Sequence, residues 1–182
     1  MPNLPPVLDS SHLPLAERMA ARLDGELYQL GNGHCPIDEP ETPQLRLAAA
    51  LAGRPTRFIA ELGTAAWVWG AVPLQPARLE LCVDLRARAR PQQARHASVR
   101  EVALTASDLA VLGVCRVTIP LRTAVDLARA REPFEASDAD AVRQLAELGR
   151  FGIEECRSLM DRGRNLPAKV RALGRLRDAL CS

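Results

Sequence analysis

The sequence predicts an α+β fold: a small, mostly antiparallel sheet with covering helices, followed by a helical C-terminal annex. The strands are indicated by two runs, Leu79–Leu85 with apolar and polar residues alternating at period two, and the β-branched run Val114–Ile119. The annex is indicated by a wholly helical pattern after Arg131. We therefore divide the chain into residues 1–56, 57–130 and 131–182.

Residues 1–56 are expected to form a short helix, a wing-like hairpin and a second helix. The first helix spans Pro14 to Leu23, with apolar residues at steps of four (Leu15, Met19, Leu23). The hairpin Glu26–Ile37 contains a Gly-Asn-Gly turn. Thr42 is a suitable cap for a helix that ends near Ala52. Four arginines against seven acidic residues give this segment a net charge of −3.

Both tryptophans lie in residues 57–130, in a helix predicted from Thr64, as its N-cap, to Gly70. Trp67 and Trp69 are two residues apart, so they cannot share one helix face. We expect one of them in the core and the other near the surface, either at the core rim or as a contact for a partner. After this helix, the strand at 79–85 is expected to pair with a second strand at about 98–104.

The stretch around which the chain is organised joins the strand Val114–Ile119 to a helix through Thr118 and Pro120. Proline ends the strand and suits the first position of a helix, where its missing N–H costs nothing. Arg122 and Asp126 are four residues apart on the polar face of this helix and can pair. A structural role at the junction is favoured for these residues, with a catalytic role for Arg122 and Asp126 as the less favoured alternative.

Two basic segments are candidates for binding DNA or an acidic partner. The first is a loop with Arg86, Arg88, Arg90 and Arg95. The second is the last helix of the annex, which opens at Pro167 and carries Lys169, Arg171, Arg175 and Arg177. No aromatic residue is interleaved with the loop arginines, so stacking on single-stranded bases is not indicated. A simply solvated run of charge is the alternative.

The composition is that of an ordinary globular protein, with 47% hydrophobic and 25% charged residues and a net charge of only +2. No apolar run is long enough to span a bilayer and no signal peptide is evident, so we expect a cytoplasmic protein with no membrane partner. The five cysteines are scattered and form no C-x-x-C pair, which disfavours a metal site. No nucleotide-binding, hydrolase or metalloprotease motif occurs, so we expect no cofactor and no enzyme activity.

Three segments in order carry a family resemblance: Glu26-Leu-Tyr-Gln-Leu-Gly31, Thr64-Ala-Ala-Trp-Val-Trp-Gly70 and Val117-Thr-Ile-Pro-Leu-Arg-Thr-Ala-Val-Asp-Leu-Ala128. Together they resemble the AbiEi-type antitoxins of type IV toxin–antitoxin systems, in their actinobacterial version. The resemblance implies an N-terminal winged-helix domain, an α/β domain that confers antitoxicity, repression of the protein's own operon and a nucleotidyltransferase-like toxin as partner. Residues 1–56 are too few and too acidic for a complete winged helix that grips DNA.

Our leading functional hypothesis is therefore an antitoxin-like, non-catalytic regulator that binds a protein partner such as a cognate toxin. The alternative is a DNA-binding transcriptional autorepressor that uses the two basic segments. Trp67 or Trp69 would contribute to a protein interface, because aromatic residues and arginine dominate such contacts. The sequence leaves the oligomeric state open.

Overall fold

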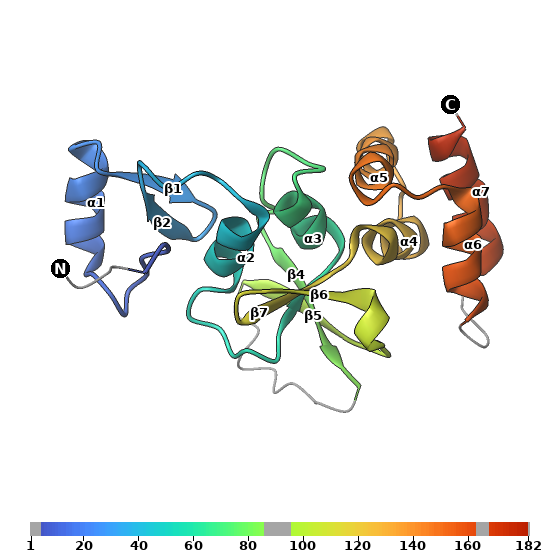
Figure 1. Ribbon diagram of the computed structural model, residues 1–182, viewed down its shortest axis with the longest axis horizontal. Helices are drawn as coiled ribbons and strands as arrows, with labels where there is room; N and C mark the ends of the chain where they lie inside the picture. The colour runs from blue at the N-terminus through green and yellow to red at the C-terminus, as the bar shows by residue number, and fades with distance from the viewer. Residues whose placement is uncertain (1–4, 86–95, 163–167, 182) are drawn as a thin grey trace.

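Figure 1 shows the computed structural model, which describes residues 5–85, 96–162 and 168–181. Its helices are α1 Leu15–Leu23, α2 Pro43–Leu51, α3 Leu62–Trp69, α4 Pro120–Ala130, α5 Ala136–Gly149, α6 Ile153–Asp161 and α7 Lys169–Leu180. Its strands are β1 Leu27–Leu30, β2 Gly33–Pro36, β3 Ile59–Ala60, β4 Leu79–Asp84, β5 Ala97–Val102, β6 Leu109–Leu112 and β7 Cys115–Thr118. The predicted α+β class with C-terminal helices is confirmed.

The described strands form a two-stranded sheet, β1-β2, and a five-stranded sheet of order β5-β4-β3-β7-β6. Three of the five pairings are antiparallel, β1 with β2, β3 with β4 and β6 with β7. The pairings of β3 with β7 and of β4 with β5 are parallel, so the larger sheet is mixed. The expected pairing of the 79–85 strand with the next strand is observed, with Leu79 beside Ala97 and Asp84 beside Val102.

The two helices that cover the larger sheet begin for different reasons. At α2 the Thr42 hydroxyl accepts the backbone N–H of Leu45 at 3.2 Å, as the sequence predicted. The α3 helix begins at Leu62, two residues before the predicted cap. Thr64 is instead inside the helix, where its hydroxyl accepts the N–H of Glu80 at 2.8 Å and ties α3 to β4. Gly70 ends α3 with a φ of 83°, a conformation that glycine adopts without strain.

Buried apolar side chains form two clusters that meet at α3. The first lies between the larger sheet and helices α2 and α3, and includes Phe58 and Leu81. The second lies among α3, α4 and the three C-terminal helices, and includes Leu127 and Leu145. Trp69 packs against both clusters. The helical annex therefore shares a core with the α3–α4 region.

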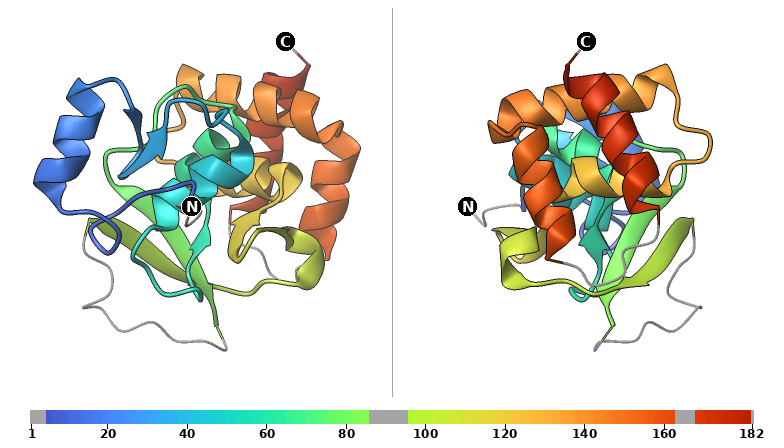
Figure 2. Two further views of the ribbon diagram at one scale, coloured as in Figure 1. Left: turned by 60° about the vertical axis from the view of Figure 1, so that its left-hand side comes forward. Right: turned by 90° about the vertical axis from the view of Figure 1, so that its right-hand side faces the viewer.

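The elements follow one another along the long axis of the molecule. Figure 1 shows α1 and the β1–β2 hairpin at one end, α2, α3 and the larger sheet in the middle, and α5, α6 and α7 at the other end. Figure 2 shows the same arrangement from two further sides, with the C-terminal helices gathered around α4. Surfaces at the two ends are therefore well separated.

Candidate functional site

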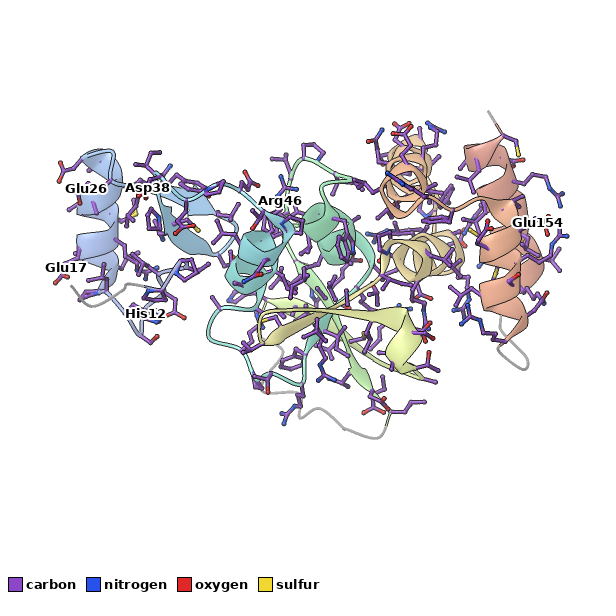
Figure 3. The ribbon with its side chains drawn as sticks, in the orientation of Figure 1. His12, Glu17, Glu26, Asp38, Arg46 and Glu154 are labelled. Carbon is purple, nitrogen blue, oxygen red and sulfur yellow. The ribbon has the colours of Figure 1, made fainter. Side chains whose placement is uncertain are left out.

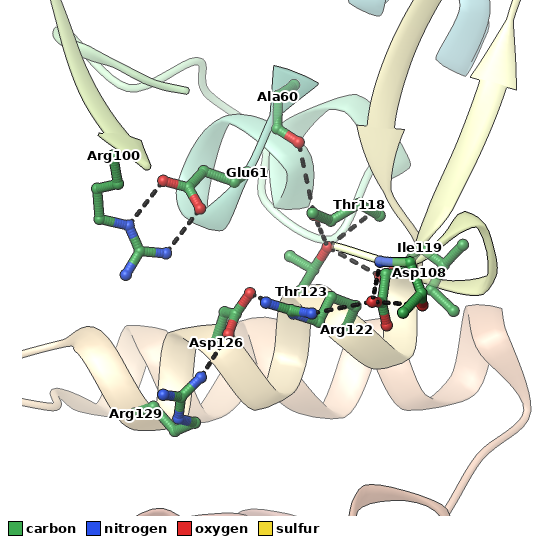
Figure 4. Close-up of polar contacts among 11 residues, drawn as sticks. Ala60, Glu61, Arg100, Asp108, Thr118, Ile119, Arg122, Thr123, Asp126 and Arg129 are labelled. Atoms are coloured by element: carbon green, nitrogen blue, oxygen red, sulfur yellow. Dashed lines mark hydrogen bonds and ion pairs between the residues drawn. The ribbon is translucent and has the colours of Figure 1, made fainter. Parts of the chain in front are cut away.

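A network of buried charges lies where the larger sheet meets α4 (Figure 4). Arg122 donates from Nε to Asp126 at 2.7 Å and also pairs with Asp108 at 3.2 Å. Arg129 donates to the other oxygen of Asp126 at 3.1 Å. The side chain of Asp126 is only 2% exposed, so both arginines neutralise a charge that water does not reach. The predicted contact between Arg122 and Asp126 is thus present, and Asp108 extends it to the sheet.

The elbow at Thr118 and Pro120 holds the start of α4 in place. Pro120 is the first residue of the helix. The carbonyl of Thr118 accepts the indole N–H of Trp69 at 2.8 Å and the hydroxyl of Thr123 at 3.1 Å. The Thr118 and Thr123 hydroxyls are 2.7 Å apart. Because these groups are buried and bonded to one another, their positions suit a structural junction rather than a contact site.

Glu61 and Arg100 form a second ion pair beside this network. The guanidinium donates two hydrogen bonds, 2.7 and 2.6 Å long, to the two carboxylate oxygens. Burial raises the pKa of Glu61 above its ordinary value, and Arg100 acts in the opposite direction. Burial also raises the pKa of the nearby Cys82 thiol, which disfavours the nucleophilic thiolate. Three carboxylates are thus matched by three guanidinium groups, and this balance favours a structural role.

The tryptophans occupy different environments, as their spacing predicted. Trp67 is 3% exposed, with the guanidinium of Arg46 5.6 Å from its ring centroid. Trp69 is half-buried, and its N–H is bonded to the Thr118 carbonyl. Trp69 therefore lies at the core rim, which is one of the two positions that the sequence left open for it.

The basic residues of α7 largely face acidic residues of the same chain. Lys169 pairs with Asp161, and Arg171 pairs with Glu132 at 2.9 Å. Arg175 donates to the carbonyls of Ala128 and Arg131 at 3.0 and 2.9 Å, which fixes α7 against the end of α4. Arg177 is exposed. The loop candidates Arg86, Arg88, Arg90 and Arg95 lie outside the described residues.

The sequence predicted an apolar stripe on α1 but not that this stripe is exposed. Leu15, Met19 and Leu23 are 63%, 38% and 85% exposed. The buried residue of this helix is Arg18, which donates to the Leu13 carbonyl at 3.1 Å and contacts His34 Nδ1 at 3.4 Å. The helix therefore turns Arg18 toward the protein and its apolar stripe toward solvent. The signal was visible in the steps of four, but periodicity does not say which way a stripe faces.

Two further classes of site find no support in the parts of the chain that are described. No group of three or more His, Cys, Asp or Glu side chains is placed to hold a metal ion. No helix there combines the length and the apolar character that crossing a membrane requires.

Comparisons with known proteins identify no family for this chain. No protein-family model matches the chain, and no curated protein does. The crystal structure of the RV2827C protein from Mycobacterium tuberculosis is similar, with 24% sequence identity and a TM-score of 0.49. The match covers 93% of this chain and 70% of that one. It carries no functional conclusion for this chain.

Proposed function

We propose that this chain is an antitoxin-like, non-catalytic regulatory protein that acts by binding a protein partner. The family resemblance of the sequence motifs makes a nucleotidyltransferase-like toxin the first partner to test. The observation that carries the proposal is the exposed apolar stripe of α1, formed by Leu15, Met19 and Leu23. We call it the α1 stripe.

The α1 stripe is unusual because the buried residue of this helix is a charged one, Arg18, while its large apolar residues are exposed. Large apolar side chains that gather on one exposed face mark interaction sites more often than scattered ones do. Burying one leucine side chain fully is worth about 1.5–3 kcal/mol, so a partner that covers the stripe gains substantial affinity. A helix of this length is only marginally stable alone, which makes its fixed position dependent on Arg18 and the hairpin.

The alternative of a DNA-binding repressor receives less support from the described surfaces. Lys169 and Arg171 on α7 each pair with an acidic residue, and Arg175 is fixed against α4. Residues already paired in this way gain less from a phosphate, because an existing ion pair must first be broken. A protein interface at the α1 stripe needs no such exchange.

The test is co-expression of the chain with a nucleotidyltransferase-like toxin from the same genome. We expect the chain to restore growth and to co-elute with the toxin in size-exclusion chromatography. A Leu15→Gln/Leu23→Gln variant should bind at least about tenfold more weakly, because both apolar contacts are lost without a change of charge. Its melting temperature should stay close to that of the unmodified chain, since both side chains are exposed.

The matched control is Val114→Gln/Val170→Gln, which alters two strongly exposed apolar residues, 81% and 86%, outside α1. This control should restore growth and co-elute as the unmodified chain does. Absence of any complex with the unmodified chain, or an equal loss of binding in both double variants, would contradict the proposal.

A further inference from the structure

The α1 stripe lies in an acidic part of the molecule. Residues 5–42 contain seven acidic residues and two arginines, a net charge of −5 with histidine neutral. Six of the seven acids are exposed: Glu17, Asp24, Glu26, Asp38, Glu39 and Glu41. Of the two arginines, Arg18 is buried, and Arg22 donates to Gln29 at 3.2 Å. Figure 3 shows Glu17, Glu26 and Asp38 around α1 and the hairpin, at the end of the molecule opposite Glu154.

Five of these six acids are left without a basic partner within the described parts of the chain. Among the described residues, Glu17, Asp24, Glu26, Asp38 and Glu39 form no ion pair, whereas Glu41 pairs with Arg46 at 2.6 Å. At the other end of the chain, Asp140 and Glu154 each pair with an arginine of their own helix. We call these five unpaired acids the acidic rim of the α1 stripe, and their negative charge is available to a partner.

This negative charge limits which kind of partner can bind the α1 stripe. A second copy of the chain would bring one acidic rim against another, and like charges across an interface disfavour association. Nucleic acid would be repelled for the same reason. The complementary surface is a cationic protein face with an apolar patch, and proteins concentrate cationic charge in this way where they bind a nucleic-acid backbone.

We infer that the α1 stripe and its acidic rim dock on the nucleic-acid-binding face of the partner, so that the chain and nucleic acid exclude each other there. This inference rests on the proposed function, because it concerns the same surface. The acids stand where phosphates would otherwise lie, and the apolar stripe adds contacts that a phosphate backbone does not offer. The rim would speed association, and the stripe would slow dissociation.

The experiment measures binding of the full chain to the nucleotidyltransferase-like toxin. Heparin is the competitor, because it is a polyanion that binds cationic protein surfaces and has no bases. We expect heparin to displace the chain competitively, and raising salt from about 50 to about 300 mM to slow association by about tenfold. Glu17→Gln/Glu26→Gln/Asp38→Asn should slow association by a similar factor and leave the dissociation rate nearly unchanged.

The matched control neutralises three exposed acids at the opposite end, Asp140→Asn/Glu147→Gln/Glu154→Gln. It should associate as fast as the unmodified chain. A complex that forms but resists heparin, or an equal slowing in both triple variants, would overturn this inference and leave the proposed function standing. Absence of any complex would overturn both. A homodimer that Leu15→Gln/Leu23→Gln dissolves would also overturn it, because the occupant would then be a second copy.

Discussion

At the scale of single residues, Asp126 is the centre of the charge network. Its carboxylate is 2% exposed and accepts from both Arg122 and Arg129. The Nε of Arg129 has no hydrogen-bond partner among the described residues, so this guanidinium depends on Asp126. Asp126→Ala should therefore lower the free energy of unfolding by about 3–5 kcal/mol, since it leaves buried positive charge uncompensated.

Urea denaturation measures this change, with Asp140→Ala as the control. Asp140 pairs with Arg143 at an exposed position, so its loss should leave the unfolding midpoint almost unchanged. If Asp126→Ala kept the midpoint and abolished binding of the toxin, the network would have to be assigned to the interface instead.

His34 is a second residue whose surroundings predict a measurable effect. Burial lowers its pKa below the ordinary value of 6.5, and the charges of Arg18 and Arg22 act in the same direction. The folded protein thus favours the neutral ring, while the unfolded chain takes up a proton as the pH falls below about 6.5. The stability contributed by the neutral ring is complete above that pH and is lost as the pH falls toward the lower pKa of the folded state.

We expect the unmodified chain to lose more stability between about pH 7.5 and about pH 5.5 than His34→Gln does, by chemical denaturation at each pH. His96→Asn is the control, because the His96 side chain is exposed and asparagine tolerates its positive φ of 57°. Parallel stability curves for the unmodified chain and His34→Gln would refute this assignment.

At the scale of elements, local signals in the sequence were sufficient to predict most helices. In the larger sheet they predicted the pairing of β4 with β5. The cap at Thr42 and the pair Arg122–Asp126 are contacts three and four residues apart, so spacing predicts them. Thr64 failed as a predicted cap because its hydroxyl bonds to β4. β6 was missed because its four residues, Leu-Ala-Val-Leu, show no alternation of apolar and polar types.

At the candidate site, too, the features set by nearby residues could be predicted from the sequence, and the contacts between distant residues could not. Periodicity predicts the α1 stripe, but its direction depends on the contact between Arg18 and His34, sixteen residues apart. Glu61 and Arg100 are thirty-nine residues apart in the chain. They meet only because the sheet places β3, which Glu61 follows, and β5, which contains Arg100, on either side of β4. Such contacts are set by tertiary packing, and neither helical nor strand spacing predicts them.

At the scale of the whole molecule, Trp69 links the two apolar clusters because it lies between them. Its ring packs against the sheet cluster and the helical cluster, and its N–H is bonded to the carbonyl at the start of α4. The C-terminal helices also pack directly on α4, so they cannot separate without exposing Ala124, Leu127 and Ala128. Unfolding one cluster should therefore destabilise the other, and the chain should unfold in a single cooperative transition.

Tryptophan fluorescence reports the α3 environment, whereas far-UV circular dichroism is weighted toward the helices, four of which lie between residues 120 and 180. We expect the two denaturation curves of the unmodified chain to coincide. In Trp69→Ala the truncation should cost about 3–5 kcal/mol and the curves should begin to diverge, because the residue that joins the clusters is lost. Trp67→Ala should cost a similar amount yet keep the curves coincident, since Trp67 belongs to the sheet cluster alone. Two separate transitions in the unmodified chain would mean that residues 131–182 fold independently of the sheet.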